Sequence, residues 1–323
     1  MPSSVAKEDL RGSALIYSRA IQIPQMKARI HLLTFALTLF LAATTFAAER
    51  QLRIIAFGAH PDDAEFQMGG TAIKFAKAGH KVKLVSVTNG DLGHWKMAGG
   101  PLAIRRTKEV KEAAKRMGIE VEVLDIHDGE LTPSLENRKK ITRLIREWNA
   151  DMVFAHRPWD YHPDHRYTGV LVQDAAFMVA VPFITPDTTP VTRNPVFFYF
   201  PDRFTKPYPF EPDIAISIDD VFDEKVNAID ALESQVYEGG ALANPAVLIQ
   251  RKAADPKARK EILKLSWSRR QGSIAKRFRN ELIEWYGEEK GKAVKHAEAF
   301  ELCEYGKQPS KAELKKLFPF FDK

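Results

Sequence analysis

Two short segments of the chain concentrate histidine and aspartate, the side chains that bind metal ions and transfer protons. The first reads Ala-His-Pro-Asp-Asp-Ala-Glu at residues 59–65, and the second reads His-Pro-Asp-His at residues 162–165. Metallohydrolases use three protein ligands of these types and leave a fourth position of the metal for water. The two segments therefore predict metal-assisted hydrolysis, provided that the fold brings them together.

The first segment comes directly after the apolar run 52–57, which ends in Gly58, and the second lies in the loop after the apolar run 152–155; both runs predict buried strands. Further strands are expected at residues 82–88, 121–124 and 214–218, and helices at residues 69–79, 102–117, 135–148, 168–179 and 221–237. This alternation predicts an α/β fold with a Rossmann-like, mostly parallel sheet flanked by helices. Because the carboxyl ends of parallel strands share one edge of the sheet, the two segments are expected to meet there.

One ion can be held by both segments together. The first segment offers His60 and Asp63, and the second offers His165. Zn²⁺ suits this set, and Fe²⁺ accepts the same ligands. Cys303 is the only cysteine, which excludes an internal disulfide and a thiolate-rich zinc cluster.

Three neighbouring side chains suit the proton transfers of hydrolysis. Asp62 lies beside a ligand and is the natural general base, while His162 can be held protonated by Asp164 to serve an oxyanion or a leaving amine. Structural roles are the alternative for each: an Asp pair after a strand can cap a helix, and a His beside Pro can be solvated. A facial triad that holds non-heme iron is an alternative metal site. It would give Asp62, His162 and Asp164 no catalytic role, so we rank it lower.

The length and charge of the chain limit the kinds of binding partner to be expected. With 323 residues and a formal net charge of +6, the chain can bury a full core and gives little reason to expect a nucleic-acid partner. Residues 251–279 carry eleven Lys or Arg against two acids. A solvated helical face is favoured for them over a binder of anionic surfaces. Residues 181–213, rich in Pro and aromatic residues, are expected to form a wall around the site.

The N-terminus predicts export. Met26 begins a short basic stretch that is followed by an apolar run and by small residues suited to cleavage after Ala47 or Ala48. We interpret residues 26–48 as a signal peptide and residues 1–25 as a disordered upstream extension. Residues 49–323 then form one domain, with a core at 52–180 and a C-terminal elaboration at 181–323. The protein is expected to be periplasmic or secreted, without stable membrane insertion after cleavage; an uncleaved membrane anchor is the alternative.

Together these motifs resemble the LmbE-like or PIG-L family of zinc-dependent N-deacetylases. The resemblance rests on residues 59–65 with Gly-Gly-Thr at 69–71, and on His-Pro-Asp-His-Arg at 162–166. Weaker matches follow in order, at residues 88–93, at Arg106, at residues 128–131 and at Ala-Glu-Ala-Phe 297–300. One departure is Ala64, which stands before Glu65 where many members carry Glu, so Glu65 is given no ligand role.

The resemblance implies a Rossmann-like fold and hydrolysis of the N-acetyl group of an amino sugar, commonly an N-acetylglucosamine conjugate. It implies zinc ligands at His60, Asp63 and His165, a base at Asp62, an oxyanion or leaving-group role for His162, and sugar contacts at Arg106 and Asp128. The expected partner is thus a small amino sugar, and a homo-oligomer is compatible with the sequence. A zinc amidase acting on a non-sugar amide and a non-catalytic sugar-binding protein are the alternatives.

Overall fold

The computed structural model describes residues 50–243 and 255–321. The expected signal peptide and upstream extension lie outside these residues. Within the described ranges, no helix combines the length and the apolar character needed to cross a membrane.

Seven strands form the central sheet in the order β3-β2-β1-β4-β5-β7-β6. The first five pair in parallel, and β7 runs antiparallel to both of its neighbours. The strands are β1 (Arg53–Gly58), β2 (Lys81–Ser86), β3 (Glu120–Val123), β4 (Met152–Ala155), β5 (Val196–Tyr199), β6 (Ile214–Ser217) and β7 (Ala297–Gly306). Because successive connections run outward in opposite directions from β1 and β4, the strand order reverses between these two strands. In open α/β sheets, ligands bind in the crevice at such a reversal.

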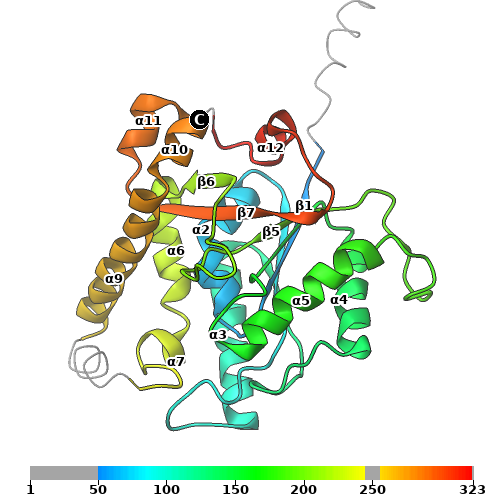
Figure 1. The fold of residues 1–323 in the computed structure, drawn as a ribbon. Coiled ribbons are helices and arrows are strands. Elements are labelled where there is room, and N and C mark those ends of the chain that lie inside the picture. The colour runs from blue at the N-terminus through cyan, green and yellow to red at the C-terminus, as the bar shows by residue number, and fades with distance from the viewer. Residues whose placement is uncertain (1–49, 244–254, 322–323) are drawn as a thin grey trace, which may run out of the picture. The chain divides into compact units, whose positions relative to one another are not determined.

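Helices cover both faces of the sheet. They are α2 (Asp63–Lys77), α3 (Gly100–Met117), α4 (Leu135–Trp148), α5 (Pro163–Met178), η1 (Asp219–Val221), α6 (Phe222–Ile229), α7 (Glu233–Val236), α9 (Pro256–Arg277), α10 (Arg279–Tyr286), α11 (Glu288–Ala293) and α12 (Lys311–Leu317). In Figure 1, α4 and α5 lie on one side of the sheet, and α6 and α9 lie on the other. The α/β prediction is thereby confirmed, with two antiparallel pairings added by the C-terminal strand.

Strand β1 shows why the sheet is buried on both faces. Ile54 and Ala56 face the core that includes α2, α3 and α6, while Ile55 and Phe57 face the core under α4 and α5. All four side chains have no exposed surface. A parallel strand covered by helices on both sides needs a continuous apolar sequence, which is the pattern that predicted it.

The predicted bounds of α4 and β4 are confirmed, but two helices begin earlier than predicted. Helix α2 begins at Asp63, not Gly69, and α5 begins at Pro163, not Thr168. The histidine and aspartate segments therefore occupy first helical turns as well as loops. The predicted helix over residues 221–237 is also wrong, since it is divided into η1, α6 and α7.

Asp219 and Asp220, the two acids at the start of this segment, cap neither η1 nor α6 with their side chains. The Asp219 carboxylate accepts the backbone N–H groups of Lys295 at 2.9 Å and His296 at 2.8 Å, and the Asp220 carboxylate pairs with Lys74 at 2.8 Å. Both acids thus bind segments distant in sequence rather than the helix that follows them.

The buried Glu298 carboxylate connects β7 to the middle of α2 and forms an ion pair with Lys225 of α6. The Glu298 carboxylate accepts the backbone N–H groups of Gly70 at 2.8 Å and Thr71 at 2.7 Å, and the Lys225 ammonium group from α6 at 2.5 Å. A Cβ at position 70 would lie 3.0 Å from this carboxylate and 2.8 Å from Ile218, so the close approach requires glycine. The glycines that suggested the start of α2 instead lie inside it, where another strand's side chain approaches the backbone.

Candidate active site

The predicted site residues meet at the reversal between β1 and β4. His60 lies in the turn after β1, Asp62 occupies the N-cap position of α2 without a capping hydrogen bond from its side chain, and Asp63 is the first residue of the helix. After β4, His162 occupies the N-cap position of α5 and His165 lies in its first turn. Two strand-to-helix connections, separated by about a hundred residues of sequence, thus supply one cluster of side chains.

Three of these side chains converge with a spacing that suits a metal ion. His60 Nδ1 lies 3.2 Å from Asp63 Oδ2 and 3.3 Å from His165 Nε2, and Asp63 Oδ2 lies 3.4 Å from His165 Nε2. A tetrahedral zinc site with bonds of about 2.0–2.2 Å has ligand-to-ligand edges of about 3.3–3.6 Å. The predicted ligand set therefore has the dimensions of a metal site.

Carboxylates behind the two imidazoles fix which ring nitrogen faces this triangle. His60 Nε2 lies 3.1 Å from Asp128 and 3.3 Å from Asp164, and His165 Nδ1 lies 3.1 Å from Asp160. Each of these nitrogens is placed to donate its proton to a carboxylate. The other ring nitrogen, Nδ1 of His60 and Nε2 of His165, then carries no proton and directs its lone pair toward Asp63. Three acceptors then point at one another, and a proton or a metal ion between them would stabilise this arrangement.

The electrostatics of the cluster agree with this arrangement. Burial alone would lower the pKa values of His60 and His165, but the surrounding carboxylates outweigh burial and raise both, that of His60 well above its usual range. Burial alone would raise the pKa of Asp63, but the charges of His165 and His156 hold it well below its usual range. The cluster thus retains positive charge strongly, and a divalent ion can take the place of that proton.

Asp62 is placed differently from Asp63. Its Oδ1 atom lies 3.1 Å from Arg106 Nη2, outside the ligand triangle. Burial raises the pKa of Asp62, and the Arg106 charge only partly opposes that shift. A carboxylate with a raised pKa beside a metal site is well suited to accept a proton from water near neutral pH. Glu65, whose pKa is raised to about 8 by burial and by the Asp62 and Asp63 charges, has no place in the triangle.

Arg106 is buried and forms no ion pair with Glu109, the acid three residues further along the same helix. Only 2% of the residue is exposed, and its guanidinium group also donates to the carbonyl oxygens of Gly90 at 3.0 Å and Pro61 at 3.2 Å. A Cβ at Gly93 would lie 2.1 Å from Arg106 Nη1, so glycine at this position makes room for the guanidinium. Arg105, the preceding residue, makes the ion pair with Glu109 instead.

Asp128 lies between His60 and Arg106. Its Oδ1 atom contacts His60, and its Oδ2 atom lies 3.8 Å from Arg106 Nη1. Although burial alone would raise the pKa of Asp128, its hydrogen bond to His60 and the nearby positive charges leave it lowered. The structure thus assigns Asp128 a contact with a predicted metal ligand that the sequence did not suggest.

The predicted pairing of Asp164 with His162 is wrong. The Asp164 carboxylate accepts the Gly129 N–H at 2.7 Å and faces His60, and its backbone N–H donates to His162 Nδ1 at 3.2 Å. Burial lowers the pKa of His162, with the charges of His60 and His165 acting in the same direction. The lowered pKa favours a neutral His162 ring, and the N–H donated by Asp164 to Nδ1 then places the ring proton on Nε2.

Two residues of the cluster were missed in the sequence. Asp160 accepts both from the His165 ring and from the His162 backbone N–H at 3.1 Å. His156 is buried, stacks on His165 with ring centroids 4.1 Å apart, and lies 3.4 Å from Asp63. His156 directly follows a predicted strand, which was an available signal, but its Nε2 atom already lies 3.2 Å from the Ala59 N–H and is less free to bind a metal.

A cavity of about 600 Å³ opens beside the cluster. Asp62, Asp63 and His165 line it, together with Tyr161 and Phe204 from the loops after β4 and β5. Its volume lies within the range of about 300–1,000 Å³ found for small-molecule sites. The predicted wall at residues 181–213 is confirmed in part, since residues 201–204 line this cavity.

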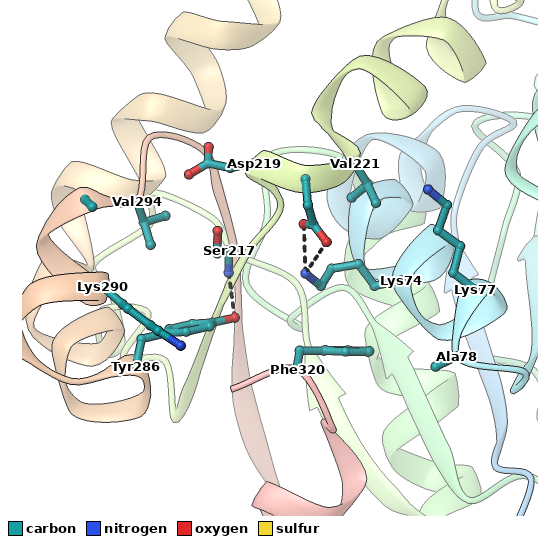
Figure 2. Close-up of a pocket in the computed structure, with 12 residues that line it drawn as sticks. Lys74, Lys77, Ala78, Ser217, Asp219, Val221, Tyr286, Lys290, Val294 and Phe320 are labelled. Atoms are coloured by element: carbon teal, nitrogen blue, oxygen red, sulfur yellow. Dashed lines mark hydrogen bonds and ion pairs between the residues drawn. The ribbon is translucent and has the colours of Figure 1, made fainter. Parts of the chain in front are cut away.

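A second cavity, of about 470 Å³, lies elsewhere (Figure 2). It is lined by side chains that include Lys74, Tyr286 and Phe320, and by none of the predicted site residues. Lys74 is engaged by Asp220, and the Tyr286 hydroxyl accepts the Ser217 N–H at 3.1 Å. The lining offers no converging set of metal ligands, so the catalytic chemistry belongs to the first cavity.

Comparisons with known proteins point to the same segments. The PIG-L family model, described as GlcNAc-PI de-N-acetylase, matches residues 55–176. The chain is similar to the diacetylchitobiose deacetylase of Thermococcus kodakarensis, with 32% identity over 197 residues that cover 58% of this chain and 71% of that protein. It is also 24% identical over 195 residues to the 4-oxalmesaconate hydratase of Pseudomonas putida, covering 58% of this chain and 75% of the hydratase.

The fold has a solved counterpart. The N,N'-diacetylchitobiose deacetylase of Pyrococcus horikoshii, solved with an inhibitor, superimposes with a TM-score of 0.59 and 23% identity, covering 87% of this chain and 94% of that chain. The shared fold therefore extends beyond the matched family segment into the C-terminal part of the chain.

Proposed function

The chain belongs to the PIG-L, or LmbE-like, family, and from that premise we propose that it is a zinc-dependent deacetylase. It hydrolyses the N-acetyl amide of an N-acetylglucosamine-like sugar or conjugate and releases acetate and the free amine. The observation that carries the proposal is the triangle of acceptor atoms from His60, Asp63 and His165, with Asp62 directly beside it. The similarity to a diacetylchitobiose deacetylase supports the amino-sugar substrate.

The residues present divide the work of amide hydrolysis. A zinc ion held by His60, Asp63 and His165 would supply Lewis acidity that activates water and polarises the acetyl carbonyl. Asp62 takes the proton of the attacking water and returns it to the amine as the carbon–nitrogen bond breaks. His162, with its proton on Nε2, donates a hydrogen bond to the oxygen that becomes negative.

The test separates metal binding from proton transfer. We expect the Asp62→Asn variant to keep its bound metal and lose acetate release, because an amide preserves the shape of the carboxylate but accepts no proton. We expect the His165→Ala variant to lose both. Metal content is measured by elemental analysis and turnover by acetate release from N,N'-diacetylchitobiose. Equal metal loss in the two variants would contradict the assigned roles.

A substrate panel decides between this activity and its alternatives. Acetate release from N-acetylated amines but not from sugars would favour a non-sugar amidase. Hydration of 4-oxalmesaconate without any acetate release would favour the reaction of the Pseudomonas putida relative. Sugar binding without turnover would favour a non-catalytic role, against which the intact cluster of Asp62 and the three ligands argues.

We also propose that the enzyme is exported, on the strength of the basic, apolar and small-residue pattern at residues 26–48. N-terminal sequencing of the mature protein, expressed with residues 1–48 present, is expected to begin after Ala47 or Ala48. An intact N-terminus in the cytoplasmic fraction would contradict it.

A further inference from the structure

Two chemically different groups of side chains line the cavity beside the catalytic cluster. The first group is Asp62, Asp63 and His165, and the second consists of arginines from the C-terminal elaboration. Two of these, Arg270 and Arg277, come from α9, which contains most of the basic segment found in the sequence. Arg203, from the loop after β5, is the third.

Arg270 makes no direct ion pair within residues 50–243 and 255–321. Its guanidinium carbon lies 4.8 Å from the centroid of Trp267 and 5.7 Å from that of Phe66, so aromatic faces hold it in position. Packing around the guanidinium lowers the pKa of Arg270, and the negative charges of Asp63 and Asp62 offset only part of that lowering. Arginine nevertheless stays charged, which leaves a positioned cation open to the cavity.

The other two arginines add to this charge. Arg277 donates to the carbonyl oxygens of Asp202 at 2.9 Å and Phe210 at 3.4 Å, which fix its position without neutralising it. Arg203 is exposed, and no ion pair engages it within the described part of the chain.

The acids that line the cavity are already engaged. The Asp202 carboxylate lies 3.1 Å from Arg157, and Asp160 lies against His165. Asp62 pairs with Arg106, and Asp63 belongs to the ligand triangle. The arginines of the cavity thus provide a surplus of positive charge that a substrate can complement.

We propose that Arg270, with Arg203 and Arg277, forms a subsite for an anionic group of the substrate, a carboxylate or a phosphate monoester. The inference rests on the proposed deacetylase function and specifies its substrate class: an N-acetylated amino sugar that carries a negative charge away from the acetamide. The planar guanidinium of Arg270 suits either anion because both accept two parallel N–H groups. The acetamide then lies near Asp62 while the anion lies near α9.

Kinetics with matched substrates test the subsite. We compare kcat/KM for N-acetylglucosamine, N-acetylglucosamine 6-phosphate and N-acetylmuramic acid, which are neutral, phosphorylated and carboxylated. We expect the wild-type enzyme to favour at least one anionic sugar. The Arg270→Gln substitution should reduce the ratio of anionic to neutral kcat/KM by about 10- to 100-fold, as expected for losing a hydrogen-bonded charge pair. The two anionic sugars show which anion the subsite prefers.

The control is Arg269→Gln on the same helix, because Arg269 does not line the cavity. It should leave the substrate ratio within about 2-fold of wild type. An equal effect of the two substitutions, or equal losses of neutral and anionic turnover in Arg270→Gln, would overturn the subsite.

A binding measurement separates this inference from the deacetylase proposal. In the Asp62→Asn background, calorimetry with N-acetylglucosamine 6-phosphate, N-acetylmuramic acid and N-acetylglucosamine reports affinity without turnover. Tighter binding of an anionic sugar that disappears with Arg270→Gln supports the subsite even if wild-type protein releases no acetate, an outcome that would refute only the enzyme activity. Equal affinity for neutral and anionic sugars would refute the subsite even if the wild-type enzyme is an active deacetylase.

Discussion

Replacing Lys225 with methionine is expected to destabilise the fold more than any surface substitution of the same type. Lys225 and Glu298 both have no exposed surface. The ammonium group donates to Glu298 at 2.5 Å, to the Phe66 carbonyl at 2.9 Å and, with the Gln271 amide oriented to suit its neighbours, to that side chain at 2.8 Å. All three ammonium protons therefore have acceptors. Methionine carries no hydrogen-bond donor, so all three acceptors lose this partner.

The magnitude follows from what remains after the substitution. Glu298 keeps the N–H groups of Gly70 and Thr71 but loses its counter-charge in a fully buried place. Removing one partner of a buried ion pair costs about 3–5 kcal/mol. For a domain of this size, that loss lowers the melting temperature by roughly 6–20 °C.

The assay is urea unfolding followed by circular dichroism, together with calorimetry at a fixed zinc concentration, since bound metal also stabilises the fold. Lys292→Met, which breaks the exposed pair with Glu288 on α11, is the matched control and should change stability by no more than about 0.5 kcal/mol. Adding Glu298→Gln to Lys225→Met should recover part of the loss, because the unpaired charge is removed. If Lys225→Met unfolds like the control, the ion pair does not stabilise the core as argued.

Three predictions concern the site itself. Asp160→Asn should weaken zinc affinity by about 10- to 100-fold, since the carboxylate orients the His165 ring; a chelator competition assay measures this. Gly93→Ala should lower kcat/KM for acetate release by roughly 10- to 100-fold, because the added methyl group displaces the Arg106 guanidinium. Arg106→Met should shift the acidic limb of the kcat/KM profile to higher pH: Arg106 lowers the pKa of Asp62, and without it the base stays protonated to a higher pH.

Each of these has a control in the same molecule. Asp174→Asn removes a carboxylate that pairs with Arg138 on the surface, and it should leave zinc affinity unchanged. Gly100→Ala adds a methyl group that meets no atom within 4 Å, and it should leave kcat/KM unchanged. An acidic limb in Arg106→Met that stays at the wild-type pH would show that Asp62 does not set it.

The sequence correctly predicted the bounds of those helices and strands that a local residue pattern specifies. Helix α4 and strand β4 have the predicted bounds, because an amphipathic period and a short apolar run each specify their own structure. The start of α2 was missed because Gly69 and Gly70 suggest a boundary, whereas Glu298 needs them inside the helix. That contact joins residues more than two hundred positions apart, and no local pattern contains it.

The candidate site also has features that the sequence predicted and features that only the fold determines. The types and spacing of His60, Asp63 and His165 suggested one ion, and the fold brings their ligand atoms together. The partners of the imidazoles depend on ring orientation. Asp164 therefore faces His60 instead of the neighbouring His162, and Asp160 was not identified at all.

The position of β7 determines when the central sheet can be completed during synthesis of the chain. It is the last strand in the sequence, yet it lies between β5 and β6. A nascent or truncated polypeptide that ends before residue 297 exposes two unpaired strand edges, and such edges recruit other chains. The sheet is therefore completed only after β7 has been synthesised, and fragments that end before it are expected to aggregate rather than form smaller enzymes.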